Sequence, residues 1–229
     1  MKKTIAIVAV LATMLSFAVA KDYSFTFGAQ GFFGEGWGKS WGKDTQDAFD
    51  MMKQAGLKVS DPFDLNMLYG GGAFINLPIA ANFGVQPEVN YMVNNTGYKM
   101  EDDSSNWMSA CISYNSIDIP VLFTYKALKF NFLVGPYISI PVGDFSVVSK
   151  DSSSTADDTS TGTIASKTLF GMMFGFNVAE RMGGQYLILG ARYMLDFSPI
   201  QMKDSTSGDV SDLYTRRALL VNAGIRFAL

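Results

Sequence analysis

The sequence predicts an all-β fold: a single eight-stranded antiparallel up-and-down barrel whose strands cross a membrane. Three observations support this. Apolar and small or polar residues alternate along eight segments, the connections between these segments alternate between short and long, and charged residues make up only 17% of the chain. Ordinary soluble proteins carry roughly 25% charged residues, so the shortage indicates a large surface that does not face water.

Residues 1–20 have the pattern of a secretory signal peptide. Two lysines give a positive start, an apolar run follows from Ile5 to Leu15, and Ala18-Val19-Ala20 is a small-x-small cleavage sequence. The alternative is an N-terminal membrane anchor, although the apolar run is short for a membrane-spanning helix. We therefore expect an exported domain over residues 21–229 that crosses the membrane with strands alone.

Each of the eight segments has one apolar face and one small or polar face, because side chains alternate between the two sides of a strand. Residues 83–94 show this most clearly, with apolar odd positions and mostly Gly, Gln, Glu and Asn at the even ones. Most segments reach the 9–11 residues that a tilted strand needs to cross a bilayer. The predicted strands are 23–33, 67–77, 83–94, 117–126, 130–142, 170–178, 187–197 and 219–229.

The connections between these strands alternate in length, as they do in bacterial outer-membrane barrels. Three are short, and four are long and polar. Export places the N-terminus in the periplasm, so the short turns are expected there and the long loops outside the cell. The short turns are 78–81, 126–129 and 179–184, and the long loops are 35–66, 95–111, 144–166 and 198–215.

Two of the long loops have internal features. Residues 44–56 predict a short helix, with Asp44 as its cap, an apolar stripe through Phe49 and Gly56 at its end. The Ser, Thr and Asp-rich segment 150–163 has the low-complexity composition of a mobile loop.

A soluble ligand-carrying barrel of the lipocalin type would show the same alternation with its apolar face inward. The composition of the other face separates the two folds. A solvated face would be rich in Lys, Glu and Thr, whereas this face is dominated by Gly, Asn, Ser, Gln and Met. Small and neutral-polar residues fit the crowded interior of an eight-stranded barrel, so the membrane barrel is favoured.

Four strand motifs resemble the PorT-like family of outer-membrane β-barrel proteins, over roughly residues 67–229. The resemblance implies a small barrel in the bacterial outer membrane, with no catalytic residues. Three of the motifs place proline inside a strand, where it lacks a ladder donor, so we expect bulges or strand ends there. The motifs are Gln86-Pro87-Glu88, Ile119-Pro120-Val121-Leu122, Gly135-Pro136-Tyr137 and Gly190-Ala191-Arg192-Tyr193.

Charged residues of both signs fall on the face that is expected to line the lumen. In so narrow a barrel a lone buried charge is very costly, so a salt-bridged plug is favoured. A charged pore lining is the functional alternative. The six residues are Glu88, Asp118, Lys126, Arg192, Asp196 and Arg226.

Composition also argues against several function classes. A net charge of -3 gives no basic footprint for nucleic acid. The chain has no histidine and one cysteine, so we expect no enzyme activity, cofactor or metal site. The expected partners are outer-membrane lipid and the barrel-assembly machinery, with an extracellular ligand or host partner left open. Two functions remain: a structural or surface-interaction barrel, and a small transport barrel for ions or solutes.

The last eight residues, 222–229, resemble a barrel-assembly signal, in which the final strand pairs with the assembly machinery by strand addition. The pattern is a polar residue at Asn222, glycine at Gly224, and apolar residues at Phe227 and Leu229. An ordinary edge strand is the alternative.

Deleting Phe227-Ala228-Leu229 should leave export intact and stop insertion into the outer membrane, because the final strand could no longer be recognised or close the barrel. Cell fractionation should show aggregated or degraded periplasmic protein. Ala228→Ser serves as the control and should insert almost normally. Normal membrane levels of the truncated protein would leave the terminus as an ordinary strand.

Overall fold

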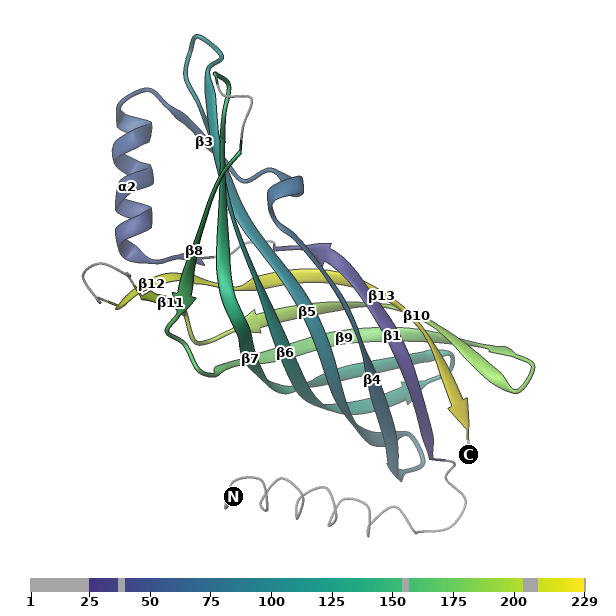
Figure 1. Cartoon of the computed structure of the whole chain (residues 1–229). Coiled ribbons are helices and arrows are strands. Elements are labelled where there is room, and N and C mark those ends of the chain that lie inside the picture. The colour runs from purple at the N-terminus through teal and green to yellow at the C-terminus, as the bar shows by residue number, and fades with distance from the viewer. Residues whose placement is uncertain (1–24, 37–39, 154–156, 204–209, 229) are drawn as a thin grey trace.

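The computed structural model describes residues 25–36, 40–153, 157–203 and 210–228, so the predicted signal peptide lies outside the described residues. Eight strands form a closed antiparallel barrel (Figure 1). The final strand pairs with the first from Thr26–Ala228 to Glu35–Leu219, which leaves no open edge. In ring order the strands are β1 (Thr26–Glu35), β4 (Met67–Ala80), β5 (Phe83–Glu101), β6 (Trp107–Ala127), β7 (Phe130–Asp151), β9 (Leu169–Met182), β10 (Gln185–Asp196) and β13 (Arg217–Ala228).

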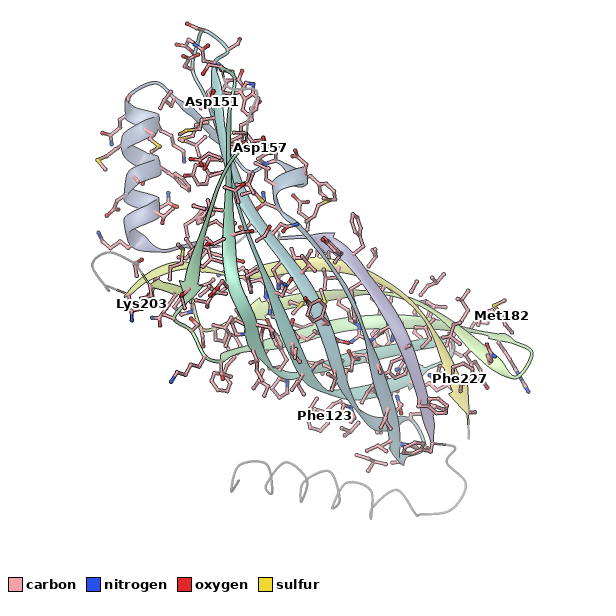
Figure 2. All side chains as sticks on the ribbon, in the orientation of Figure 1. Phe123, Asp151, Asp157, Met182, Lys203 and Phe227 are labelled. Atoms are coloured by element: carbon pink, nitrogen blue, oxygen red, sulfur yellow. The ribbon has the colours of Figure 1, made fainter. Side chains whose placement is uncertain are left out.

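The two faces of the barrel strands differ as the alternation predicts. Val89 and Phe123 point outward with 56% and 60% of their surface exposed (Figure 2 labels Phe123), whereas their neighbours Asn90 and Leu122 are 1% and 0% exposed. An apolar outer surface around a partly polar interior is the arrangement of a membrane barrel. It is the reverse of the lipocalin type.

The apolar outer band is shorter than some of the strands. Along β6 the outward positions are apolar from Tyr125 up to Ile117, and then become polar at Asn115 and Ser113. This stretch matches the roughly 9–11 residues needed to cross a bilayer. Above it β5, β6 and β7 continue as paired strands on the long-loop side. The predicted loops 95–111 and 144–166 are therefore wrong over most of their length.

Shorter elements build an outer half above the membrane band. The sheet continues from β7 through β8 (Asp158–Ile164), β11 (Ile200–Lys203) and β12 (Val210–Thr215) to β2 (Ser40–Trp41). A further strand, β3 (Lys58–Ser60), pairs with the upper end of β5. The predicted mobile loop 150–163 is thus partly a paired strand, because β8 hydrogen-bonds both β7 and β11.

The first long loop contains the predicted helix, α2 (Lys43–Gln54), followed by the short 3-10 helix η1 (Phe63–Leu65). Gly42 occupies the cap position, so the prediction of Asp44 as the cap is wrong. The helix ends as predicted near Gly56, whose φ of 89° is a conformation that glycine adopts without strain. Within the described residues, no helix is long and apolar enough to cross a membrane.

The strand prolines interrupt the ladder without shifting it. Around Pro87 the pairing of β5 with β6 skips from Pro87–Val121 to Asn90–Asp118, and the register is the same on both sides. The β6–β7 ladder skips in the same way between Pro120–Tyr137 and Phe123–Val134, beside Pro136. The expected bulges are therefore absent at these three prolines.

Val89→Arg should destabilise the barrel by about 2–4 kcal/mol, because it places a charge on the lipid face near the middle of the apolar band. Met108→Arg is the matched control: Met108 is 47% exposed on the outer half, and its substitution should cost far less. Reversible urea unfolding in lipid vesicles measures both. Equal costs would mean that the apolar band does not mark the bilayer.

Candidate functional site in the barrel lumen

The inward side chains form layers along the barrel axis. On β10 the inward side chains beyond Ile188 and Gly190 are Arg192, Met194 and Asp196, and on β13 Asn222 is followed by Leu220. Polar, apolar and polar levels therefore succeed one another. We call them the lower polar layer, the middle apolar layer and the upper polar layer.

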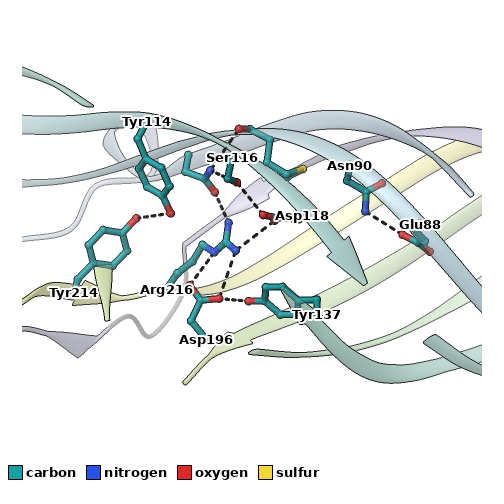
Figure 3. Close-up of polar contacts among 11 residues, drawn as sticks. Glu88, Asn90, Tyr114, Ser116, Asp118, Tyr137, Asp196, Tyr214 and Arg216 are labelled. Atoms are coloured by element: carbon teal, nitrogen blue, oxygen red, sulfur yellow. Dashed lines mark hydrogen bonds and ion pairs between the residues drawn. The ribbon is translucent and has the colours of Figure 1, made fainter. Parts of the chain in front are cut away.

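Glu88 is the centre of the lower polar layer, and Figure 3 shows its hydrogen bond with Asn90. Its carboxylate forms an ion pair with Arg192, at 3.1 Å between Oε1 and Nη2, and both side chains are fully buried. Amide groups of Gln30, Gln86 and Asn90 donate to the same carboxylate at 3.0, 2.7 and 3.1 Å. Such a set of donors compensates the loss of hydration, which for a buried charge costs several kcal/mol.

A glycine makes room for the arginine of this layer. A Cβ atom on Gly175, across from Arg192 on β9, would lie 2.5 Å from Arg192 Cδ. The amide of Asn222 extends the layer by donating to Gln30 and Asn177, each at 3.2 Å. The small residues of the polar face therefore leave space for the large inward side chains.

The middle apolar layer separates the two polar layers. Its side chains come from all eight barrel strands, and each of them is at most 5% exposed. The members are Phe32, Leu68, Met92, Leu122, Leu133, Tyr137, Met173, Met194, Ala218 and Leu220.

Arg216 is the centre of the upper polar layer (Figure 3). Its guanidinium pairs with Asp196 at 3.2 Å and with Asp118 at 3.3 Å, and its Nη1 donates to Asn94 Oδ1 at 2.7 Å. The Tyr137 hydroxyl donates to Asp196, and the Arg216 Cζ atom lies 5.7 Å from the centre of that ring. One arginine thus binds two carboxylates from β6 and β10, which β7 and β9 separate in the ring.

A second apolar cluster covers the upper polar layer from the outer half. It contains Tyr114 and Tyr214, whose hydroxyl groups lie 3.4 Å apart, with Ile112, Phe145, Leu169 and Ile200. Trp41 packs against this cluster and also contacts Phe49 of α2 and Tyr98 of β5. Helix α2 therefore packs against both β2, through Trp41, and β5, through Tyr98.

The structure brings together four of the six predicted lumen charges in two separate groups. Glu88 and Arg192 form one, and Asp118 and Asp196 belong to the other. Lys126 and Arg226 also belong to the inward-facing rows, but they line a cavity at the short-turn end of the barrel. They have no part in either ion-paired group.

Sequence reasoning missed Arg216, the residue that holds the upper group together. Counting back in twos from Asn222 through Leu220 and Ala218 leads to Arg216, so the period of the final strand could have revealed it. The prediction began this strand at residue 219 and left Arg216 just outside it. Its two carboxylate partners depend on strand register, which the sequence does not show.

The predicted assembly residues have the following places. Asn222 is buried in the lower polar layer, and Gly224 faces inward beside Gln30, where an added Cβ would lie 2.8 Å from the Gln30 side chain. Phe227 stacks on Phe27 of the first strand, with ring centres 5.3 Å apart. Leu229 lies outside the described residues.

The lumen groups are arranged for mutual neutralisation. Each of the three buried carboxylates has an arginine partner, and each also accepts a neutral hydrogen bond. Among the described residues, no group of three or more Cys, Asp or Glu side chains is placed to hold a metal ion.

A closed ring of eight antiparallel strands with an apolar outer band and a polar, filled interior defines a small bacterial outer-membrane barrel. A family model described as outer membrane protein beta-barrel domain matches residues 58–201, which is more than half of the chain. The chain belongs to this family, and its place is the bacterial outer membrane.

Similar solved structures are also outer-membrane proteins. The protein OprG from Pseudomonas aeruginosa is 12% identical, with 90% of this chain and 95% of that chain covered and a TM-score of 0.49. The protease OmpT from Escherichia coli is 9% identical, with 90% and 95% covered and a TM-score of 0.43. The attachment invasion locus protein Ail of Yersinia pestis is 10% identical, with 90% and 100% covered and a TM-score of 0.37. No curated protein matches the chain in sequence.

Arg216→Met should destabilise the barrel by about 3–5 kcal/mol, because it leaves two buried carboxylates without their cation. Adding Asp118→Asn and Asp196→Asn to this variant should restore most of the loss. Arg181→Met, at the exposed end of β9, is the control and should stay within about 0.5 kcal/mol of the parent. Urea unfolding in lipid vesicles gives these values. If Arg216→Met alone were as stable as the parent, the ion pairs of Arg216 would not be needed for stability.

Proposed function

We propose that this chain is a PorT-like outer-membrane barrel with a structural or surface-interaction role, a lumen filled by side chains and no catalytic activity. The observation that carries the proposal is that two ion-paired layers fill the lumen, with an apolar layer between them. Moving an ion through it would require breaking buried pairs, whose partners would then be left uncompensated.

The outer half supports the surface role. It is built from paired strands that share one apolar cluster, and α2 packs through Phe49 on Trp41, which contacts this cluster. Such a surface is preorganised, so binding a partner costs less free energy for ordering the surface than binding to flexible loops would. We therefore propose that the outer half presents a fixed surface outside the cell.

The absence of histidine from the sequence supports a role without catalysis. The buried carboxylates are also poor candidates for acid or base catalysis, because arginines and neutral donors already bind them.

A small transport barrel for ions or solutes is the competing function, and planar-bilayer recording separates the two. The refolded protein should produce no steady discrete openings, because the filled layers block a water path. Insertion is verified on the same sample by the shift in gel mobility on boiling. Reproducible single-channel steps from inserted protein would support the transport barrel and overturn the closed lumen.

A further inference from the structure

The lumen contains a further cavity below the lower polar layer, at the short-turn end of the barrel. We call it the short-turn mouth. Its volume is about 230 Å³, several times the roughly 30 Å³ share of one water molecule. Its walls come from β1, β4, β5, β6, β7, β9, β10 and β13, so the barrel ring itself surrounds it. It opens at the end of the barrel where Figure 2 labels Phe227.

The charged lining of the short-turn mouth has one sign. Lys126, Lys129 and Arg226 line it, and no Asp or Glu does. Glu180, next to Ala179 of the lining, pairs with Lys129 at 2.8 Å on the exposed rim. These statements refer to the described residues, and Leu229 lies outside them.

Lys126 and Arg226 differ from the cations deeper in the lumen. Arg192 and Arg216 each have a carboxylate within 3.3 Å, whereas Lys126 and Arg226 have none among the described residues. Arg226 is oriented by the ring of Tyr186, with its Cζ atom 4.8 Å from the ring centre, and its Nε is buried without a hydrogen-bond partner. Its guanidinium therefore packs on the Tyr186 ring and has a donor, Nε, that no described residue uses.

Neutral hydrogen-bonding side chains complete the lining. Thr26, Asn76, Thr124 and Asn131 contribute hydroxyl and amide groups to the same cavity. A concave site whose charges are all positive and whose walls have a low dielectric concentrates the electrostatic field and attracts anions. Arginine and lysine with amide donors form the set that recognises phosphate groups.

We propose that the short-turn mouth binds a phosphate group, with Arg226 and Lys126 as the principal ligands and Lys129 as an assisting one. The phosphate can belong to a soluble phosphate ester or to the headgroup of a phospholipid beside the barrel. Lys129 contributes less because Glu180 already neutralises it.

The test uses the full mature chain, labelled with ¹⁵N and refolded in a detergent with an uncharged sugar headgroup. Inorganic phosphate is titrated against sodium chloride at constant ionic strength, and the backbone amide shifts of Asn82 and Gly84 at the mouth are followed. Gly162, in the outer half, is the internal control. Phosphate should produce saturable shifts at Asn82 and Gly84 and none at Gly162, and chloride should produce none at any of the three.

Variants assign the binding to the proposed ligands. Lys126→Gln with Arg226→Gln should weaken phosphate binding at least tenfold, and Lys126→Gln alone, at an exposed position, should weaken it about threefold. The matched control, Lys58→Gln with Lys99→Gln in the outer half, should bind as the parent does. An unchanged gel shift on boiling verifies that each variant folds. Shifts that do not saturate, or that survive in the Lys126→Gln/Arg226→Gln variant, would overturn the site.

Two further samples separate the sources of phosphate. Soluble glycerol phosphate should bind in detergent with the same residue dependence as inorganic phosphate if the site accepts an ester. In nanodiscs of phosphatidylglycerol, a headgroup ligand should shift Asn82 and Gly84 without added phosphate, and a soluble ligand should not. Failure of both glycerol phosphate and phosphatidylglycerol to reach the mouth would contradict the proposal even if inorganic phosphate binds.

Discussion

Every polar group that the chain carries to the depth of the membrane has to find its partner inside the protein, because hydrocarbon offers none. For the backbone, the pairing of β13 with β1 meets this requirement by closing the ring. For the side chains, it is met by the burial of Glu88 against Arg192 and of two aspartates against Arg216. Closure and internal pairing therefore follow from the same constraint.

The same constraint explains which inward residues are large and which are small. Arg192 reaches Glu88 across the lumen only because Gly175 leaves the space beside it. Tyr137 reaches Asp196 next to Gly171, where an added Cβ would lie 2.6 Å from the tyrosine ring. These two glycines thus leave the room into which Arg192 and Tyr137 extend. At the short-turn mouth, Lys126 and Arg226 have no such partner among the described residues, and we propose them as ligands of a phosphate group.

The sequence predicts the eight strands and their two faces because the alternation is local and the membrane demands it along each strand. The prediction fails above the apolar band, where the outward row of β6 changes to Asn115 and Ser113 while the inward row stays apolar at Tyr114 and Ile112. The pairing of β8 with β11 joins distant segments, so no local pattern predicts it. For the lumen charges, alternation gives the correct side of the strand but not the height. The sequence therefore groups Lys126 and Arg226 with residues that lie in the two polar layers above them.

The account depends most on a lumen that excludes water, and accessibility to a charged thiol reagent tests this most directly. In a Cys111→Ser background, single cysteines replace Met92 or Met173 in the middle apolar layer, where each is 2% exposed, or Met108 on the outer half. The account predicts that Met108→Cys reacts completely while Met92→Cys and Met173→Cys stay unlabelled in the folded barrel. Labelling of the two inner positions at the rate of Met108→Cys would show a water-filled lumen and contradict it.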